Sequence, residues 1–191
     1  MAGLRLATHT DIPKLRELIE QSVRALSVGY YTSPQIESAL RYVFGPDTQL
    51  IADQTYYVIE SENGTLVAAG GWSRRRTLYG GDQMKETEDP LLDPATEPAR
   101  IRAFFVHPAW TRRGLGRQLF DQCEVDAAQA GFRAFELMAT LPGEPLYRAL
   151  GFTQLERSET RLPDGEMLPV VRMNRSISVA QTTGPALDCS S

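Results

Sequence analysis

The sequence has few of the side chains that bind metals or form cross-links. Its 191 residues include only two cysteines, Cys123 and Cys189, and two histidines, His9 and His107. Two distant cysteines do not make the framework of a disulfide-stabilised domain. Structural zinc sites need about four Cys or His ligands, mostly at short spacings, and no such set occurs. We therefore expect no metal, and a fold that depends on its hydrophobic core.

Long apolar runs and an excess of basic charge are also missing. No stretch approaches the ~18 apolar residues that a membrane span requires, and the first residues lack the apolar segment of a secretory signal. Lysine and arginine number 20 against 24 acids, for a net charge of −4, whereas nucleic-acid binding favours a strongly basic face. We expect a cytoplasmic protein with no nucleic-acid or membrane partner.

A phosphate-binding turn is the main positive signal. Residues 101–106 form a hydrophobic strand that leads through His107 and Pro108 into a helix, with Arg-Arg-Gly-Leu-Gly-Arg at 112–117. A helix start has unpaired N–H groups and a positive dipole, and glycines let a phosphate approach the backbone. The turn is not a P-loop, because no Gly-Lys-Ser/Thr occurs. Leu119 replaces the third glycine of a dinucleotide fingerprint.

A second motif follows after one intervening strand. Residues 145–152 read Pro-Leu-Tyr-Arg-Ala-Leu-Gly-Phe. Together and in this order, the two motifs resemble those of the GCN5-related N-acetyltransferase (GNAT) family, which binds acetyl-CoA. The resemblance covers nearly the whole chain, from about residue 3 to residue 175.

The hydrophobic patterns predict an order of elements that matches the GNAT fold. Strands are expected at 4–6, 56–60, 66–72, 100–106, 132–139, 152–159 and 167–174, and helices from Pro13, at 34–44, 114–130 and 144–150. The resemblance implies an α/β (α+β) fold with a mixed sheet of about seven strands and about four helices. Two strands splay apart to form the acetyl-CoA wedge. We expect one domain over residues 1–175 and a disordered tail over residues 176–191.

The resemblance also implies how the cofactor is held. Backbone N–H groups of the glycine-containing turn contact the pyrophosphate, and the backbone of the preceding strand pairs with the pantetheine arm. A threonine just past the next strand contacts the pantetheine amides. The implied cofactor-binding residues are Phe104, Phe105, Val106, Arg112, Arg113, Gly114, Leu115, Gly116, Arg117 and Thr140.

Tyr147 is the predicted general acid, because its position matches the tyrosine of the family motif. A phenol with a pKa near ~10 is protonated at neutral pH and can protonate the departing thiolate. A lone tyrosine on a short helix is more often a packing residue, but the surrounding L-Y-x-x-L-G-F pattern favours catalysis.

Glu136 is the predicted base, because many family members use a glutamate on one of the two splayed strands. It is the only acid within residues 132–139, and residues 101–106 contain none. Two alternatives stay open. In the first, Glu136 is a strand acid that faces solvent or pairs with an arginine such as Arg102. In the second, water is the base that takes the proton.

The resemblance also implies that the acceptor amine lies near two segments. One contains Tyr30 and Tyr31, and the other contains Tyr79 and residues 82–97, a run with six acids and one lysine. An acidic, aromatic entrance would concentrate cationic amines, although the run can equally be a solubilising loop.

The sequence therefore predicts an acetyl-CoA-dependent N-acetyltransferase that acts on a primary amine of a small molecule or a protein. The alternative is a catalytically silent acyl-CoA-binding module on the same fold. The sequence leaves open whether the protein is a monomer or a homodimer.

Overall fold

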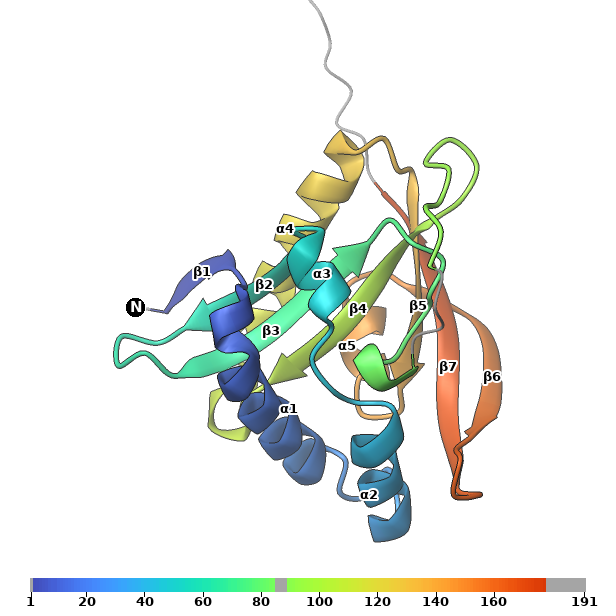
Figure 1. Ribbon diagram of the computed structural model, residues 1–191. Helices are drawn as coiled ribbons and strands as arrows, with labels where there is room; N and C mark the ends of the chain where they lie inside the picture. The colour runs from blue at the N-terminus through green and yellow to red at the C-terminus, as the bar shows by residue number, and fades with distance from the viewer. Residues whose placement is uncertain (1, 85–88, 178–191) are drawn as a thin grey trace, which may run out of the picture.

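A seven-stranded mixed sheet forms the centre of the computed structural model, which describes residues 2–84 and 89–177 (Figure 1). The strand order is β1-β2-β3-β4-β5-β7-β6. Neighbouring strands are antiparallel except β4 and β5, which are parallel. The strands are β1 (Gly3–Leu6), β2 (Tyr56–Glu60), β3 (Leu66–Ser73), β4 (Ala99–Val106), β5 (Ala134–Thr140), β6 (Thr153–Arg161) and β7 (Met167–Ser176). The predicted sheet is confirmed.

Five α-helices surround the sheet, one more than predicted. They are α1 (Ile12–Leu26), α2 (Ser33–Tyr42), α3 (Thr48–Ala52), α4 (Leu115–Gln129) and α5 (Glu144–Ala149). The missed helix is α3, whose five residues are too few to show a helical period. Its local signal is Asp47, whose carboxylate accepts hydrogen bonds of 3.1 Å from the N–H groups of Gln49 and Leu50. This N-cap satisfies N–H groups that have no partner within the helix.

The sheet opens between its two central strands. β4 pairs with β5 only at Ala99–Phe135 and Arg100–Glu136. Directly afterwards Ala103 has a positive φ of 55°, and the register between β3 and β4 shifts. A bulge of this kind bends a strand and increases its twist. The rest of β4 therefore diverges from β5, which confirms the predicted wedge.

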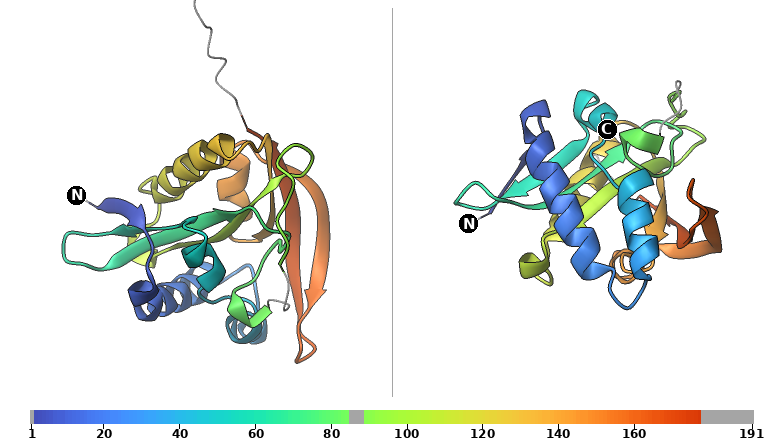
Figure 2. Two further views of the ribbon diagram at one scale, coloured as in Figure 1. Left: turned by 45° about the horizontal axis from the view of Figure 1, so that its top comes forward. Right: turned by 60° about the horizontal axis from the view of Figure 1, so that its bottom comes forward.

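Helices cover both faces of the sheet (Figure 2). α4 packs over β2, β3 and β4 on one face, and α1 packs over β3 and β4 on the other. Phe120 of α4 is fully buried against Phe135 and Phe152, with ring centroids 5.6 Å and 5.5 Å away. Burial of one such side chain stabilises the fold by roughly 1.5–3 kcal/mol. Cys123 lies in the same cluster, and its burial raises the pKa of the thiol.

The fold continues two residues beyond the predicted domain end at residue 175. Ser176 of β7 pairs with Ala134 of β5, and the N–H of Ile177 donates to the carbonyl of Arg133 at 2.8 Å. The predicted tail from residue 178 lies outside the described residues. In the described part of the chain, no helix has the length and apolar character needed to cross a membrane.

Candidate active site

A cavity of about 730 Å³ lies where β4 and β5 diverge. From the α4 and α5 side it is lined by Leu115, Leu146 and Tyr147. From the α1 and α2 side it is lined by residues such as Val23 and Phe44. Because these two groups belong to core clusters on opposite faces, the cavity passes through the sheet.

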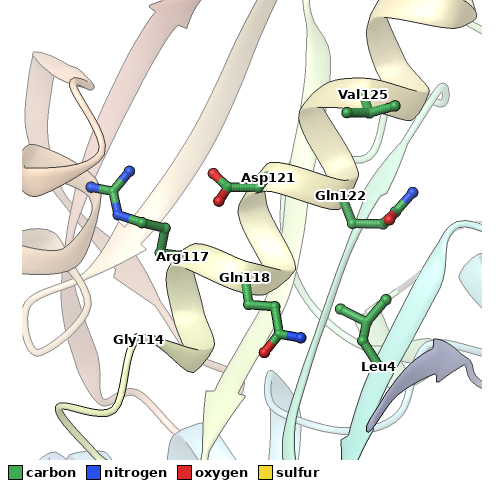
Figure 3. A pocket seen from close by; sticks show the side chains of 7 residues that line it. All are labelled: Leu4, Gly114, Arg117, Gln118, Asp121, Gln122 and Val125. Carbon is green, nitrogen blue, oxygen red and sulfur yellow. The ribbon is translucent and has the colours of Figure 1, made fainter.

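A second, shallow hollow of about 480 Å³ lies on the solvent side of α4 (Figure 3). Gln118 and Gln122 of α4 face Leu4 of β1 across it, and Arg117 and Asp121 lie on the other side of the helix (Figure 3). The hollow does not reach the diverging strands. We therefore place the candidate site in the through-sheet cavity.

The turn before α4 has the geometry of an anion-binding cradle. Arg112 and Gly114 have positive φ angles of 62° and 80°, and Arg113 between them does not. Alternation of this kind turns successive N–H groups into one concavity. Within the described residues, no backbone N–H from residue 112 to residue 117 has a protein acceptor. A Cβ at Gly116 would lie 2.9 Å from Leu146 Cδ2, so glycine lets α4 approach α5 closely.

The three arginines of the cradle have different surroundings. Arg112 and Arg117 line the cavity, and the guanidinium of Arg117 also donates to the carbonyl of Ala149 at 3.2 Å. The guanidinium of Arg113 instead stacks on the ring of Trp110 at 4.6 Å and donates to the carbonyl of Ala109 at 3.2 Å. Arg113 therefore contributes its backbone to the cradle, and its side chain holds the turn in place.

The open edge of β4 supplies backbone groups to the cavity. Beyond Arg100, β4 has no hydrogen-bonded partner in β5. The side chains of its last residues alternate between the two faces: Phe104 lies 6.2 Å from the ring of Tyr147, and Phe105 lies 6.0 Å from Phe44. A Cβ at Gly70 of β3 would collide with the Phe104 ring, so this glycine makes room for it.

Ser22 is a cavity residue that the sequence analysis missed. It is buried on α1, and its hydroxyl oxygen accepts a 3.3 Å hydrogen bond from the N–H of Val106. A single serine within an amphipathic helix gives no sequence signal of such a contact.

Tyr147 projects from α5 into the cavity and is only 8% exposed. Its ring packs against Phe104 and Phe152, and its hydroxyl makes no hydrogen bond to any described residue. Burial disfavours the charged phenolate and raises the pKa of Tyr147 above its usual range. The group is therefore a protonated donor that faces the cavity.

Thr140 lies at the end of β5, where the strand leads toward α5. It lines the cavity, and its side-chain oxygen accepts a 3.2 Å hydrogen bond from the N–H of Gly143. That bond holds the turn between β5 and α5, so the hydroxyl proton is directed elsewhere. A contact between Thr140 and a pantetheine amide stays a prediction.

Glu136 lies at the closed end of the wedge and does not line the cavity. It is 8% exposed, and its carboxylate lies 3.2 Å from the guanidinium of Arg100 and 3.0 Å from that of Arg172. These contacts match the alternative of an ion-paired strand acid, with Arg100 and Arg172 in place of Arg102. A role for Glu136 as the base stays a prediction.

Comparison with known proteins identifies the family. The model of the acetyltransferase (GNAT) family matches residues 19–152, more than two thirds of the chain. The chain belongs to this family. No curated protein sequence matches it significantly.

Solved structures share the GNAT fold of this chain at low sequence identity. A GCN5-related N-acetyltransferase from Rhodopseudomonas palustris superposes with a TM-score of 0.67 at 17% identity, covering 92% of this chain and 96% of that one. A phosphinothricin acetyltransferase from Sinorhizobium meliloti, solved with acetyl-CoA, has a TM-score of 0.61 at 21% identity, covering 98% and 94%. The PaiA N-acetyltransferase from Thermoplasma acidophilum, solved with coenzyme A, has a TM-score of 0.60 at 13% identity, covering 92% and 99%.

The three tyrosines predicted for the acceptor have different positions in this GNAT chain. Tyr30 is 49% exposed and lines the cavity, as does Tyr79, whose hydroxyl lies 3.3 Å from Thr160 Oγ1. Tyr31 does not line it. Its buried hydroxyl donates to the carbonyl of Pro169 at 2.7 Å and accepts from the N–H of Leu141 at 2.9 Å. Burial raises the pKa of Tyr31 to about 12.

Tyr31 is therefore placed as a structural link between the α1–α2 connection and β7. A direct contact of its hydroxyl with an acceptor would require the loss of both hydrogen bonds. The contact stays a prediction.

The described acids of residues 82–97 each accept a hydrogen bond from a backbone N–H group. Asp82 accepts from the N–H of Thr48 at 3.0 Å, Asp89 from that of Thr77 at 2.9 Å, and Glu97 from that of Asp93 at 2.8 Å. The Asp93 carboxylate accepts from the next turn of the loop. None of these four acids lines the cavity. The other two acids of the run, at 86 and 88, lie outside the described residues, as does the lysine at 85.

Within residues 2–84 and 89–177, no three His, Cys, Asp or Glu side chains lie close enough to hold a metal ion. His107 has a local contact instead: its Nδ1 accepts a 3.2 Å hydrogen bond from the N–H of Ala109 and caps the turn after β4.

Proposed function

We propose that this GNAT protein transfers the acetyl group of acetyl-CoA to a primary amine by direct attack in a ternary complex. The observation that carries the proposal is the through-sheet cavity. It joins a cradle of unpaired N–H groups to the edge of β4 that has no partner in β5 and to the buried phenol of Tyr147. Solved relatives with acetyl-CoA or coenzyme A support the choice of cofactor.

The cradle would hold the diphosphate of acetyl-CoA. Its free N–H groups, the α4 dipole and the guanidinium groups of Arg112 and Arg117 all favour a negative charge. The pantetheine arm would then lie in the wedge against residues 104–106, where β4 lacks a β5 partner.

Acetyl transfer requires one bond to form and one to break. The amine nitrogen attacks the thioester carbonyl carbon, and an N–H of the β4 edge stabilises the oxyanion. Collapse of this intermediate breaks the C–S bond, and the sulfur takes the electron pair. Tyr147 donates its proton to the sulfur and later regains one from solvent, while the nitrogen of the intermediate loses one to water. Overall, one proton moves from the amine to the thiol.

The acceptor needs a route to lose its proton. No carboxylate or histidine of the described residues lines the cavity, so this part of the wall offers an entering ammonium ion neither a counter-charge nor a base. Desolvation disfavours the charged form and lowers the pKa of an amine. We infer that the acceptor attacks as the neutral amine after losing its proton to water, and Glu136 as general base is the alternative.

Glu136→Gln separates these two routes. We expect kcat/KM to fall less than ~10-fold and to keep rising with pH toward the pKa of the acceptor, since the acceptor's own ionisation limits the rate. The thermal midpoint should also fall, because Arg100 and Arg172 lose their shared carboxylate. A general base contributes ~10²–10⁴-fold. A loss of that size would make Glu136 the base.

The overall proposal is tested by two measurements on the purified protein. Titration calorimetry should show binding of acetyl-CoA, and a thiol reagent should detect CoA release when an amine is added. Binding without thiol release for any amine, amino acid or peptide would favour the silent acyl-CoA-binding module. The cavity-facing phenol favours the enzyme, because a binding module needs no proton donor there.

The cradle assignment predicts a charge-reversal effect. Arg112→Glu should weaken acetyl-CoA binding tenfold or more, equivalent to at least ~1.4 kcal/mol, because Arg112 lines the cavity at the cradle. Arg133→Glu makes the same change in net charge on an exposed residue beyond α4, away from the cavity. Titration calorimetry near ~0.15 M salt keeps long-range effects small. Equal affinities of the two variants would place the diphosphate elsewhere.

Several expectations from the sequence stay predictions. They are the cytoplasmic location, the lack of nucleic-acid and membrane partners, and the oligomeric state, which is either monomer or homodimer.

A further inference from the structure

Apolar side chains form a large part of the acceptor side of the cavity, beside the polar residues Ser22, Ser27, Tyr30 and Tyr79. We use the term acceptor half for the lining residues Val23, Val43, Phe44, Leu78, Leu168 and Val170, which come from α1, the end of α2, the β3–β4 connection and β7. Five of them belong to or pack against one core cluster, Leu78 being the exception. Phe44 also meets Phe105, one of the β4 residues beside which the thioester is expected, edge to face at 6.0 Å.

The charges at the cavity wall do not match a charged acceptor. Among the described residues, the charged side chains that line the cavity are Arg102, Arg112 and Arg117. Arg112 and Arg117 belong to the cradle. Arg102 is 3% exposed, and its guanidinium is bound by the Asp47 carboxylate at 2.9 Å and by two backbone carbonyls. Within residues 2–84 and 89–177, a second ammonium group would therefore meet no carboxylate at this wall, and an acceptor carboxylate would meet no free cation outside the cradle.

Two of the polar side chains beside the acceptor half are engaged with the protein. Ser22 accepts from the N–H of Val106, and the Tyr79 hydroxyl lies within hydrogen-bond distance of Thr160. Burial of a polar ligand group without a partner costs ~1–3 kcal/mol, and more for a charge, whereas burial of an apolar group is favourable. The wall therefore selects for an apolar body attached to the reacting nitrogen.

We propose that the acceptor is a small monoamine with an apolar body, of the alkylamine or arylalkylamine class, and not a polyamine or a free amino acid. This inference rests on the proposed function and names the substrate class of the same site.

Two matched pairs of amines test the class through kcat/KM, measured by CoA-thiol release. Hexylamine and hexane-1,6-diamine differ in a second ammonium group. Phenylethylamine and phenylalanine differ in a carboxylate. We expect kcat/KM to be at least tenfold higher for the first member of each pair. Equal or reversed preference in either pair overturns the proposal, as does turnover of a peptide N-terminus without turnover of either monoamine.

A carboxylate placed in the wall should reverse the first preference. Leu78 is half-buried and lines the cavity, so Leu78→Glu should raise the diamine-to-monoamine ratio of kcat/KM by tenfold or more. Leu155→Glu, on the exposed strand β6 away from the cavity, should leave the ratio unchanged. An unchanged ratio in folded Leu78→Glu overturns the proposal. If Leu78→Glu does not fold, the two amine pairs on the parent protein decide.

The outcomes separate this inference from the proposed function. Acetyl-CoA binding by calorimetry, with thiol release only for a diamine, an amino acid or a peptide, overturns the substrate class and leaves the proposed function intact. Binding without turnover of any amine overturns both, and so does the absence of acetyl-CoA binding.

Discussion

Tyr147→Phe should lower kcat about 100-fold or more and leave the affinity for acetyl-CoA nearly unchanged. The substitution removes only the hydroxyl, while the ring keeps its contacts with Phe104 and Phe152. A lost general acid costs ~10²–10⁴-fold in rate, and equal falls in kcat and kcat/KM mark an interaction made in the transition state. Single-turnover kinetics measure the rate of the chemical step, and calorimetry measures the affinity for acetyl-CoA.

Tyr57→Phe is the matched control. Tyr57 is also a buried tyrosine, but its hydroxyl donates to Asp126 of α4 and it does not line the cavity. Its loss should lower the thermal midpoint without changing kcat more than about twofold. Full activity of Tyr147→Phe would assign protonation of the thiolate to water, and a large loss of acetyl-CoA affinity would make Tyr147 a cofactor contact.

The pH dependence of the wild-type rate adds a second test of Tyr147. Because burial raises the pKa of the Tyr147 phenol above its usual ~10, the phenol stays protonated from neutral pH to ~10. We therefore expect kcat to show no fall between neutral pH and ~10.

Loss of the buried ion pair between Asp47 and Arg102 should have the largest effect on stability. Asp47→Ala should lower the free energy of unfolding by ~3–5 kcal/mol, because it leaves the guanidinium of Arg102 buried without its counter-charge. It also removes the N-cap of α3. In a domain of this size the thermal midpoint should fall by on the order of 10 °C.

The same substitution should disturb the acceptor half of the cavity. Arg102 donates to the carbonyls of Thr77 and Gly80, on either side of Leu78 and Tyr79, which line the cavity. We expect KM for the acceptor to rise more than KM for acetyl-CoA. Asp47→Asn is the control for the cap, since asparagine is also a good N-cap but carries no charge. A thermal midpoint for Asp47→Asn within about 1 °C of the parent would show that the charge contributes little.

Contiguous features of the site could be predicted from the sequence. The cradle is a run of six residues whose arginines, glycines and helix start are encoded locally, and the structure shows its N–H groups unpaired. Tyr147 was found in the same way, through an eight-residue motif on a short helix. Strand and helix patterns gave the order of elements, because periods of 2 and 3.6 residues reflect local burial.

Features that depend on distant contacts could not be predicted in this way. Nothing near Glu136 in the sequence indicates that Arg100 and Arg172 meet its carboxylate, because they come from β4 and β7. Tyr31 and Tyr30 are adjacent in the sequence, yet one is tied to Pro169 and the other lines the cavity. Which of two neighbouring side chains is buried depends on the packing of the α1–α2 connection against β7.

The sequence by itself therefore determined the family and the fold, and it predicted the cradle and the candidate acid, since each resides in short runs of residues with their own hydrogen-bonding or hydrophobic pattern. The tertiary structure alone decided the character of the acceptor half. Its six residues lie between position 23 and position 170 and come together only when α1, α2 and β7 pack beside the opened sheet. The tertiary structure also decided that described acids of residues 82–97 accept hydrogen bonds from backbone N–H groups. Hydrogen bonds to a charged carboxylate are stronger than those between neutral groups.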